Sequence, residues 1–384
     1  MSKKFQTNNA ITLAFAHFTH DLYSAFLAPV LPILIERLKI NYFLIGVLTF
    51  IQRAPSIFMP LIGLAADRLQ VRYIVIVTPV ITAVLMSLLG VVPSYTFLAI
   101  LLFMVGISSA LFHVPSPVMV KEVSGDKIGL GMSFYMIGGE LARSLGPLII
   151  LGCISLWGFE YSYRLIPFGV VASVLLYFRL RKIKVLDDIK KENKPSRISK
   201  TIKQFLPLLL IILGITFFRA ILKSSLTIFL PVYLDSQGET LWFSGISLSV
   251  LEAAGVAGTF LAGWLSDIVG RKRLLIFVSV LTPVLMWFFT QSEGYMIFPL
   301  LILLGFFIFA TSPIILALVM DNKSDRPSFI NGMYMMINFI GSSVAALLVG
   351  FISDVIGLQL TFEISAFVAF GAVPFALMLK EKNG

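Results

Sequence analysis

The sequence contains very little cysteine and little charge for its length. Cys153 is the single cysteine, so neither a disulfide framework nor a cluster of thiolate metal ligands can form. Charged residues make up 13% of the 384 residues, roughly half the share that a soluble domain carries. Hydrophobic residues make up 58%. This composition excludes an ordinary soluble protein and indicates a membrane protein.

Several functional patterns are also missing. There is no glycine-rich loop to cradle phosphates, so ATP is not expected as an energy source. No nucleophile, base and orienting residue stand at a recognisable spacing, so we expect no enzyme activity, no cofactor and no resident metal. The first apolar stretch is too long for a cleavable signal peptide and should remain as a spanning helix.

The apolar residues are grouped in blocks long enough to cross a hydrocarbon core of ~30 Å. Backbone amides in lipid need internal partners, and the alternation of barrel strands is absent, so each block should be a helix. The sequence therefore predicts an all-α membrane protein with twelve transmembrane helices. The predicted helices are 9–35, 42–66, 73–93, 96–119, 129–155, 161–180, 204–234, 241–265, 273–290, 294–319, 328–352 and 358–379.

The net charge of +10 could suggest a nucleic-acid partner, but its distribution argues against one. With a cytoplasmic N-terminus, only Arg37, Lys39 and Arg164 would lie in loops on the far side of the membrane. The positive-inside rule then places both termini in the cytoplasm. The basic loops would also attract anionic lipid headgroups.

The longest charged connection, residues 181–203, separates six predicted helices from six. We expect an N-terminal bundle over 1–180, a basic cytoplasmic linker over 181–203 and a C-terminal bundle over 204–384. The linker is interpreted as a solvated tether, and a short helix lying on the membrane surface stays open as an alternative.

One motif occurs in both halves. Gly63-x-x-x-Asp67 and Gly263-x-x-x-Asp267 each end one apolar block, and basic residues follow. The glycines would allow close helix packing, and the aspartates would lie favourably near a helix N-terminus. A charged turn that only sets topology is the alternative. A related run, Gly350-x-x-x-Asp354, is interpreted as a helix stop.

Two six-helix halves, each made of inverted repeats, describe the major facilitator architecture. The duplicated turn resembles the signature loop of that superfamily, although Gln70 and Val71 depart from its usual pattern. The resemblance implies a pseudo-symmetric major facilitator fold, usually monomeric, whose turns hold the cytoplasmic side closed in one state. It also implies a deformable Gly-Pro in the fifth helix, typical of antiporters. The implied gating residues are Gly63, Asp67, Arg68, Arg72, Gly146, Pro147, Gly263, Asp267, Gly270, Arg271 and Lys272.

Three further segments, 16–23, 105–113 and 138–147, resemble the fosmidomycin-resistance branch of the superfamily. They carry its His-x-x-x-Asp, its Gly-x-x-Ser-x-x-Phe-His and its Gly-Gly with Ser-Leu-Gly-Pro. The resemblance implies export of drugs or small organic anions in exchange for protons. The sequence departs from the branch at His20, Glu140, Arg143 and Arg53.

Ionisable groups inside membrane helices are costly, about 3 kcal/mol or more each, and are therefore candidates for function. His17 and Asp21 are four residues apart and share a helix face. Asp21 is interpreted as the proton carrier, with a static ion pair or a water-solvated carboxylate as alternatives. Glu140 is either a second proton site or the partner of Arg143 one turn away. The predicted proton-coupling residues are thus His17, Asp21 and Glu140.

Arg219 and Lys223 are also four residues apart. They could neutralise Asp21 or bind an anionic substrate, for which the planar arginine fork is suited. A metal site formed by His17, Asp21 and His113 is conceivable but is not the favoured interpretation. The predicted substrate-binding residues are His20, Arg53, His113, Arg143, Arg219, Lys223 and Glu252.

The leading hypothesis is a monomeric, proton-coupled exporter of a small anionic or amphiphilic compound in the cell inner membrane. One alternative is a proton symporter that imports an organic anion. Another is a membrane sensor or scaffold that does not translocate its ligand.

Overall fold

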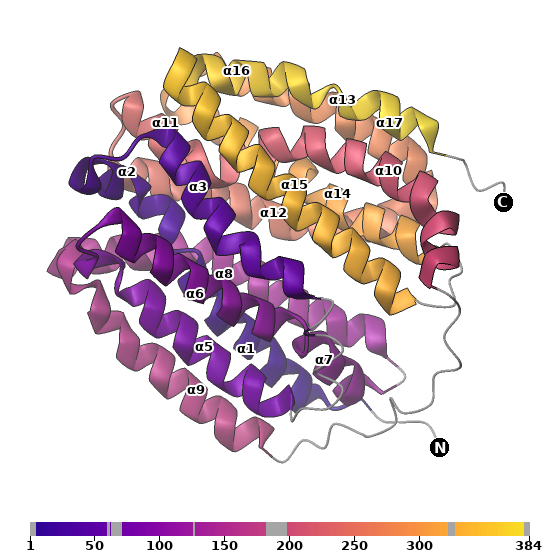
Figure 1. Cartoon of the computed structure of the whole chain (residues 1–384), viewed down its shortest axis with the longest axis horizontal. Coiled ribbons are helices and arrows are strands. Elements are labelled where there is room, and N and C mark those ends of the chain that lie inside the picture. Colours follow the sequence, from indigo (N-terminus) through magenta and orange to yellow (C-terminus); the bar gives the residue numbers. More distant parts are fainter. Residues whose placement is uncertain are drawn as a thin grey trace. The chain divides into compact units, whose positions relative to one another are not determined.

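The computed structural model describes residues 5–59, 62, 71–125, 127–181, 198–321 and 327–379. Within these ranges the chain forms helices and the turns between them, and no strand (Figure 1). Eleven of the described helical segments are long and apolar enough to cross a membrane, and a shorter apolar one covers Tyr42–Phe58. The predicted all-α membrane fold is confirmed. The linker residues 182–197 lie outside the described ranges.

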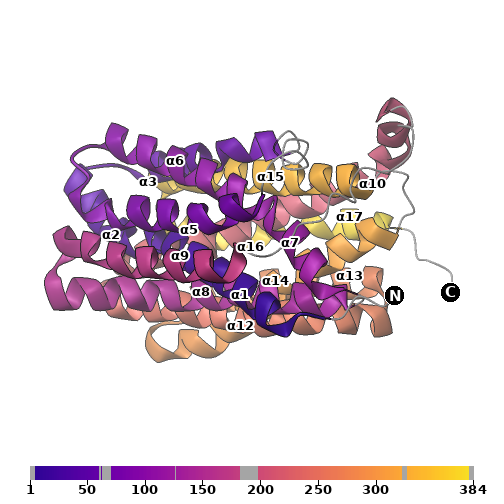
Figure 2. The same cartoon turned by 90° about the horizontal axis from the view of Figure 1, so that it is seen from below.

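The chain divides into two compact units. Unit 1 comprises Met1–Leu38 and Ile51–Glu192, and unit 2 comprises Lys39–Phe50 and Asn193–Gly384. In unit 1, α5 packs against both α6 and α9, and the two views show these helices side by side (Figure 1, Figure 2). The elements of unit 1 are α1 (Thr7–Ser24), α2 (Leu27–Leu38), η1 (Ala54–Phe58), α5 (Val71–Ser87), η2 (Leu89–Val91), α6 (Tyr95–His113), α7 (Ser116–Ser124), α8 (Ile128–Trp157), η3 (Phe159–Leu165) and α9 (Ile166–Leu180).

Unit 2 contains the second half of the chain together with a short segment of the first. Its core is formed where α10, α13, α14, α15 and α17 pack together. Helix α3 (Tyr42–Arg53) begins in unit 2 and ends in unit 1. The other elements of unit 2 are α10 (Ile198–Ser224), η5 (Ser225–Phe229), α11 (Leu230–Ser236), α12 (Leu241–Val269), α13 (Arg271–Thr290), η6 (Gly294–Met296), α14 (Ile297–Asp321), α15 (Pro327–Ile356), α16 (Leu358–Ala369) and α17 (Ala372–Met378).

Several predicted helices are interrupted, among them the blocks 9–35, 96–119 and 204–234. The first breaks at Ala25, because the ring of Pro29 would clash with the carbonyl four residues before it. The block 96–119 breaks after His113, where Pro115 and Pro117 follow in the same way. The block 204–234 contains a π-helical segment, η5, just before Pro231. Such irregular turns are often found at functional sites.

Glycines allow α8 to lie directly on α1. A Cβ placed on Gly138 would lie 2.2 Å from the carbonyl oxygen of Ala14, closer than two such atoms can approach. A Cβ on Gly146 would lie 2.6 Å from the Cβ of Ala25, beside the break between α1 and α2. Helix α8 continues without interruption through Pro147. Close backbone approach of this kind is typical of packed membrane helices.

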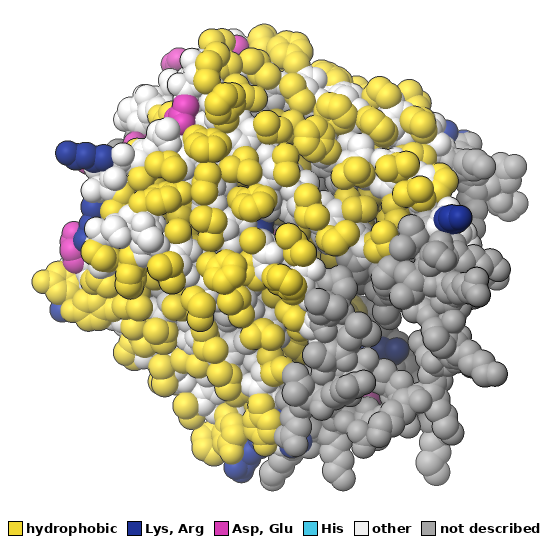
Figure 3. Space-filling model, viewed as in Figure 1, with side chains coloured by type: hydrophobic (Ala, Val, Ile, Leu, Met, Phe, Trp, Pro, Cys, Tyr) yellow, Lys and Arg dark blue, Asp and Glu magenta, His cyan; other side chains and the backbone are white. Residues whose placement is uncertain are grey.

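The outer surface is largely apolar. The face in Figure 3 is covered mainly by hydrophobic side chains, and most of its charged side chains lie near the margins. On α9, Phe168, Val171, Leu175 and Phe178 are exposed and follow a helical spacing. An apolar stripe that remains exposed on a folded helix is suited to contact with lipid.

Candidate functional site

Three ionisable residues of unit 1 lie in the last two turns of α1, just before its break. His17, His20 and Asp21 are all buried, with exposed fractions of 5% or less. The backbone N–H of Ala25 donates to the carbonyl of Asp21, so regular helix continues as far as the break. The three side chains are therefore positioned by rigid helix.

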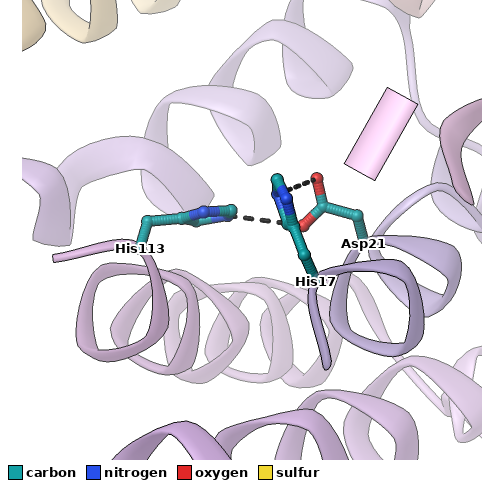
Figure 4. Close-up of side chains that lie close together, drawn as sticks. All are labelled: His17, Asp21 and His113. Atoms are coloured by element: carbon teal, nitrogen blue, oxygen red, sulfur yellow. Dashed lines mark ion pairs between the residues drawn. The ribbon is translucent and has the colours of Figure 1, made fainter. Parts of the chain in front are cut away.

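The Asp21 carboxylate is the centre of this cluster. Its Oδ2 lies 3.3 Å from His17 Nε2, and its Oδ1 lies 3.4 Å from His113 Nε2 on α6 (Figure 4). His20 Nδ1 lies 3.0 Å from Oδ1. Arg143 Nη1, on α8, donates to Oδ2 at 2.9 Å. One carboxylate thus contacts three imidazoles and one guanidinium.

Helix α8 fixes the orientation of His17. Gly139 has no side chain to collide with the imidazole, whose Nε2 would lie 2.5 Å from an added Cβ. His17 Nδ1 lies 2.7 Å from the carbonyl oxygen of Tyr135. A carbonyl only accepts hydrogen bonds, so Nδ1 must carry a hydrogen. In neutral His17, Nε2 then presents a lone pair to the Asp21 oxygen. Two acceptors at this distance require a proton or a cation between them.

The remaining members of the cluster set its charge and its exposed edge. Arg143 also forms an ion pair with Glu140 one turn earlier on α8. With neutral histidines, the cluster has two carboxylates and one guanidinium, and therefore lacks one positive charge. The side chains of His113 and Arg143 are 29% and 34% exposed, whereas that of Asp21 is 6% exposed. The buried carboxylate is thus reached past His113 and Arg143.

Aromatic rings line the cluster. The ring of His17 stacks on Tyr135 with a centroid distance of 4.0 Å, and His20 stacks on Phe112 at 4.4 Å. These contacts hold the two imidazoles in place beside Asp21. Tyr135 and Phe112 were not among the predicted site residues, because apolar positions of a helix do not show which ring faces a neighbouring helix.

Unit 2 contains a separate basic pair on α10. Arg219 is 9% exposed, and its Nη2 lies 3.3 Å from the carbonyl oxygen of Ile308 on α14. Its Nη1 is buried and has no hydrogen-bond partner among the described residues. Lys223 lies one turn later, with its ammonium 4.7 Å from the centre of the Phe309 ring. A buried guanidinium with an unused donor is well suited to an anion.

Other predicted binding residues lie elsewhere. Glu252 is buried on α12 in unit 2. Arg53, the last residue of α3, is half-buried in unit 1, and no ion pair joins it to another described residue.

The predicted gating turns are only partly described. Gly63, Asp67 and Arg68 lie outside the described residues, and at Gly263 and Asp267 only the helical backbone of α12 is described. Arg72 packs its guanidinium 4.9 Å from the ring centre of Tyr73. Gly270 has φ +95°, a conformation that favours glycine, and ends α12. Arg271 and Lys272 then begin α13.

Asp354 has a role that the sequence interpretation missed. Helix α15 ends two residues after it, but its carboxylate also accepts hydrogen bonds from the backbone N–H groups of Tyr42 and Phe43, each at 2.9 Å. It therefore caps the N-terminus of α3. A Cβ on Gly350 would lie 2.3 Å from the carbonyl oxygen of Tyr42, which explains the close approach of α3 and α15. In the sequence, the Gly-x-x-x-Asp spacing of Gly350 and Asp354 was the feature that could have indicated this contact.

Comparisons with known proteins agree with this fold. The Fosmidomycin resistance protein of Escherichia coli (strain K12) is 23% identical over 371 residues, which cover 93% of this chain and 89% of that protein. The Uncharacterized MFS-type transporter YfnC of Bacillus subtilis (strain 168) is 24% identical over 383 residues, 97% of this chain and 93% of that protein.

Solved structures show the same fold at low sequence identity. A bacterial homolog of the human lysosomal transporter Spinster, in an inward-facing and occupied conformation, matches with a TM-score of 0.80 and 14% identity, over 98% of this chain and 97% of that one. A variant of the nucleoside transporter NupG matches with a TM-score of 0.75 and 17% identity, over 97% of this chain and 100% of that one. The sequence profile of the Major Facilitator Superfamily matches residues 13–346 and 253–383. The chain therefore belongs to the major facilitator superfamily of membrane transporters.

Proposed function

We propose that the protein is a proton-coupled antiporter that exports a small anionic or amphiphilic compound by alternating access. The observation that carries the proton coupling is the facing pair of acceptors, His17 Nε2 and Asp21 Oδ2, 3.3 Å apart. A proton shared between them removes their repulsion and supplies the positive charge that the cluster lacks. When that proton leaves, the buried carboxylate keeps its contacts with Arg143 and with the imidazoles of His20 and His113.

The cluster has the parts that a releasable proton needs. Histidine changes its charge near physiological pH, and a buried carboxylate is sensitive to each neighbouring charge. Arg143 contacts both Asp21 and Glu140, so it can shift its contact between the two carboxylates as the proton arrives or leaves. His113, at the exposed edge, is suited to pass the proton to water.

Arg219 supports an anionic substrate. Its buried Nη1 has no partner among the described residues, and an unsatisfied charged donor costs free energy until an acceptor arrives. A carboxylate or phosphate oxygen of the substrate would satisfy it. Lys223, one turn away, would add a second positive charge at the same face of α10.

Export is supported by the relative named for fosmidomycin resistance, because a carrier confers resistance by removing a compound from the cell. The apolar helices and basic loops support a multi-pass location in the inner membrane with both termini in the cytoplasm. We further propose that the chain works as a monomer. The gating turns around Asp67 and Asp267 would close its cytoplasmic side.

The test is solute flux in proteoliposomes under an imposed pH gradient. A thermal-shift screen of organic acids, phosphonates and drugs first identifies a substrate, because a ligand that binds the folded state raises its stability. Wild-type flux should rise with the gradient, and Asp21→Asn should lose this dependence. Glu363→Gln is the control, since it removes a carboxylate of α16 that accepts from Gln359 outside the cluster.

Each outcome has a clear meaning. If Asp21→Asn responds to the gradient as the wild type does, Asp21 does not carry the coupled proton. Uptake of protons together with the substrate would replace the exporter by an importing symporter. Tight binding without flux would indicate a sensor.

A further inference from the structure

We propose that His17 Nε2, the Asp21 carboxylate and His113 Nε2 form a binding site for one divalent transition-metal ion of the Zn²⁺ type. The proposal goes beyond the transport function, because the binding of an ion does not depend on any movement of substrate. The sequence alone gave this site little support. The proposal rests on the short distances between donor atoms of α1 and α6.

Each imidazole lies at the spacing of a metal ligand from one of the two Asp21 oxygens. Zinc binds histidine nitrogen and carboxylate oxygen at about 2.0–2.2 Å in tetrahedral geometry, so neighbouring ligand atoms are roughly 3.3 Å apart. His17 Nε2 lies 3.3 Å from Asp21 Oδ2, and His113 Nε2 lies 3.4 Å from Asp21 Oδ1. The three ligand atoms all lie within 4.8 Å of one another. Figure 4 shows both imidazoles directed at the carboxylate.

The surroundings of His17 are those of a metal-binding histidine. Such a histidine donates its second ring nitrogen to a carbonyl or carboxylate, which fixes its orientation and leaves the first nitrogen free to bind. His17 Nδ1 lies 2.7 Å from the carbonyl oxygen of Tyr135, and the Tyr135 ring stacks on the imidazole. His20 and Arg143 hold the Asp21 carboxylate in the same way.

Charge and access are also suitable. When the histidines are neutral, the two carboxylates and one guanidinium give the cluster a net negative charge, which favours a cation. Arg143 competes for Asp21, but it also pairs with Glu140, which can keep the guanidinium when an ion approaches. The side chain of His113 is 29% exposed, so a water or a substrate oxygen would approach from its side as fourth ligand.

The ligand types define the class of ion. Two imidazoles and one carboxylate suit Zn²⁺, Co²⁺ or Fe²⁺, whereas Ca²⁺ and Mg²⁺ prefer oxygen ligands throughout. An ion at this position would occupy the His17 lone pair to which the coupled proton binds. If the proposed function holds, the ion would therefore inhibit proton-driven flux.

The test is ion binding by the purified full chain, with any polyhistidine tag removed. Zn²⁺ is titrated by calorimetry, and Co²⁺ by its visible absorption, which is intense when coordination is tetrahedral. We expect one ion per chain. His17→Gln and His113→Gln should each weaken binding by more than about tenfold, since even the loss of an indirect partner costs 10- to 100-fold.

Glu363→Gln is the control. It removes a carboxylate of α16 that accepts from Gln359 outside the cluster and leaves the three ligands and their partners intact, so it should not weaken binding. Thermal unfolding shows which variants fold, and His113→Gln, at the exposed edge, can be used even if His17→Gln does not fold.

Two results would overturn the proposal: no stoichiometric binding by folded wild type, or a loss of affinity no greater for His113→Gln than for Glu363→Gln. This failure differs from failure of the transport proposal. A chain without metal binding but with Asp21-dependent, pH-driven flux is still a proton-coupled carrier, whereas a chain that binds the ion without flux retains only the metal site.

Discussion

At the scale of single residues, a backbone carbonyl decides the chemistry of the site. The Tyr135 carbonyl occupies His17 Nδ1 and so leaves the Nε2 lone pair facing Asp21. The contact depends on Gly139, because a larger residue at this position of α8 would displace the imidazole. The state of the carboxylate therefore depends on a residue that has no side chain.

Gly139→Ala tests this dependence. The added Cβ would lie 2.4–2.5 Å from Cε1 and Nε2 of His17, so the ring must move. We expect a loss of about 1–3 kcal/mol in the free energy of unfolding, as for other overpacked sites, and weaker pH-driven flux. Gly152→Ala on the same helix is the control, since nothing lies within 4 Å of its Cβ. Equal stability and flux in the two variants would contradict the prediction.

A second prediction concerns Arg219, a binding residue that we expect to lower the stability of the unliganded protein. Arg219→Met removes a buried donor that has no partner among the described residues. The free energy of unfolding of the unliganded protein, measured by thermal unfolding, should rise by about 1–3 kcal/mol, which is the usual penalty of such a donor. The variant should also lose flux of the anion. Arg219→Lys retains the buried charge and should not gain stability. A destabilised Arg219→Met would instead show that the guanidinium stabilises the fold.

At the scale of elements, α3 is shared between the two units. Its first turns belong to unit 2, where Asp354 caps its N-terminus and Gly350 allows it to approach α15. Its C-terminal end belongs to unit 1, where Gly106 of α6 approaches the carbonyl of Gln52.

Asp354→Ala tests the cap. It removes the acceptors of the Tyr42 and Phe43 N–H groups, and the loss of an N-cap costs about 0.5–2 kcal/mol. Hydrogen exchange over the first turn of α3 should accelerate accordingly. Asp354→Asn keeps one acceptor oxygen and should remain close to the wild type. Unchanged exchange in the alanine variant would show that the cap does not hold α3.

At the scale of the whole molecule, the basic loops are expected to set the orientation in the membrane. The chain offers a simple background for a test, because Cys153 is its only cysteine and is buried. Lys127 and Glu160 are both exposed and lie at opposite ends of α8. The positive-inside rule places Lys127 in the cytoplasm and Glu160 on the far side.

In a Cys153→Ser background, we expect a membrane-impermeant maleimide to label Glu160→Cys in intact cells. Lys127→Cys should be labelled only after the membrane is opened, because its loop lies in the cytoplasm. The parent chain without cysteine controls for background labelling. The reverse pattern would invert the proposed topology and place both termini outside.

The sequence by itself determined the membrane class and the helical structure of the apolar blocks. Runs of apolar residues longer than a bilayer leave the backbone no other way to satisfy its hydrogen bonds. It also determined that His17 with Asp21, and Glu140 with Arg143, share helix faces, because residues three or four apart are neighbours on any helix.

Only the tertiary structure decided what lies opposite those faces. Spacing along α1 could not show that His113 reaches Asp21, that the Tyr135 carbonyl fixes His17, or that Arg143 bridges two carboxylates. These contacts join different helices, so they depend on the rotation and separation of each pair. Glycines on α8 allowed α1 to approach, and prolines ended α1 and α6 beside the cluster. Helical periodicity is local, whereas the packing of one helix on another is a property of the whole chain.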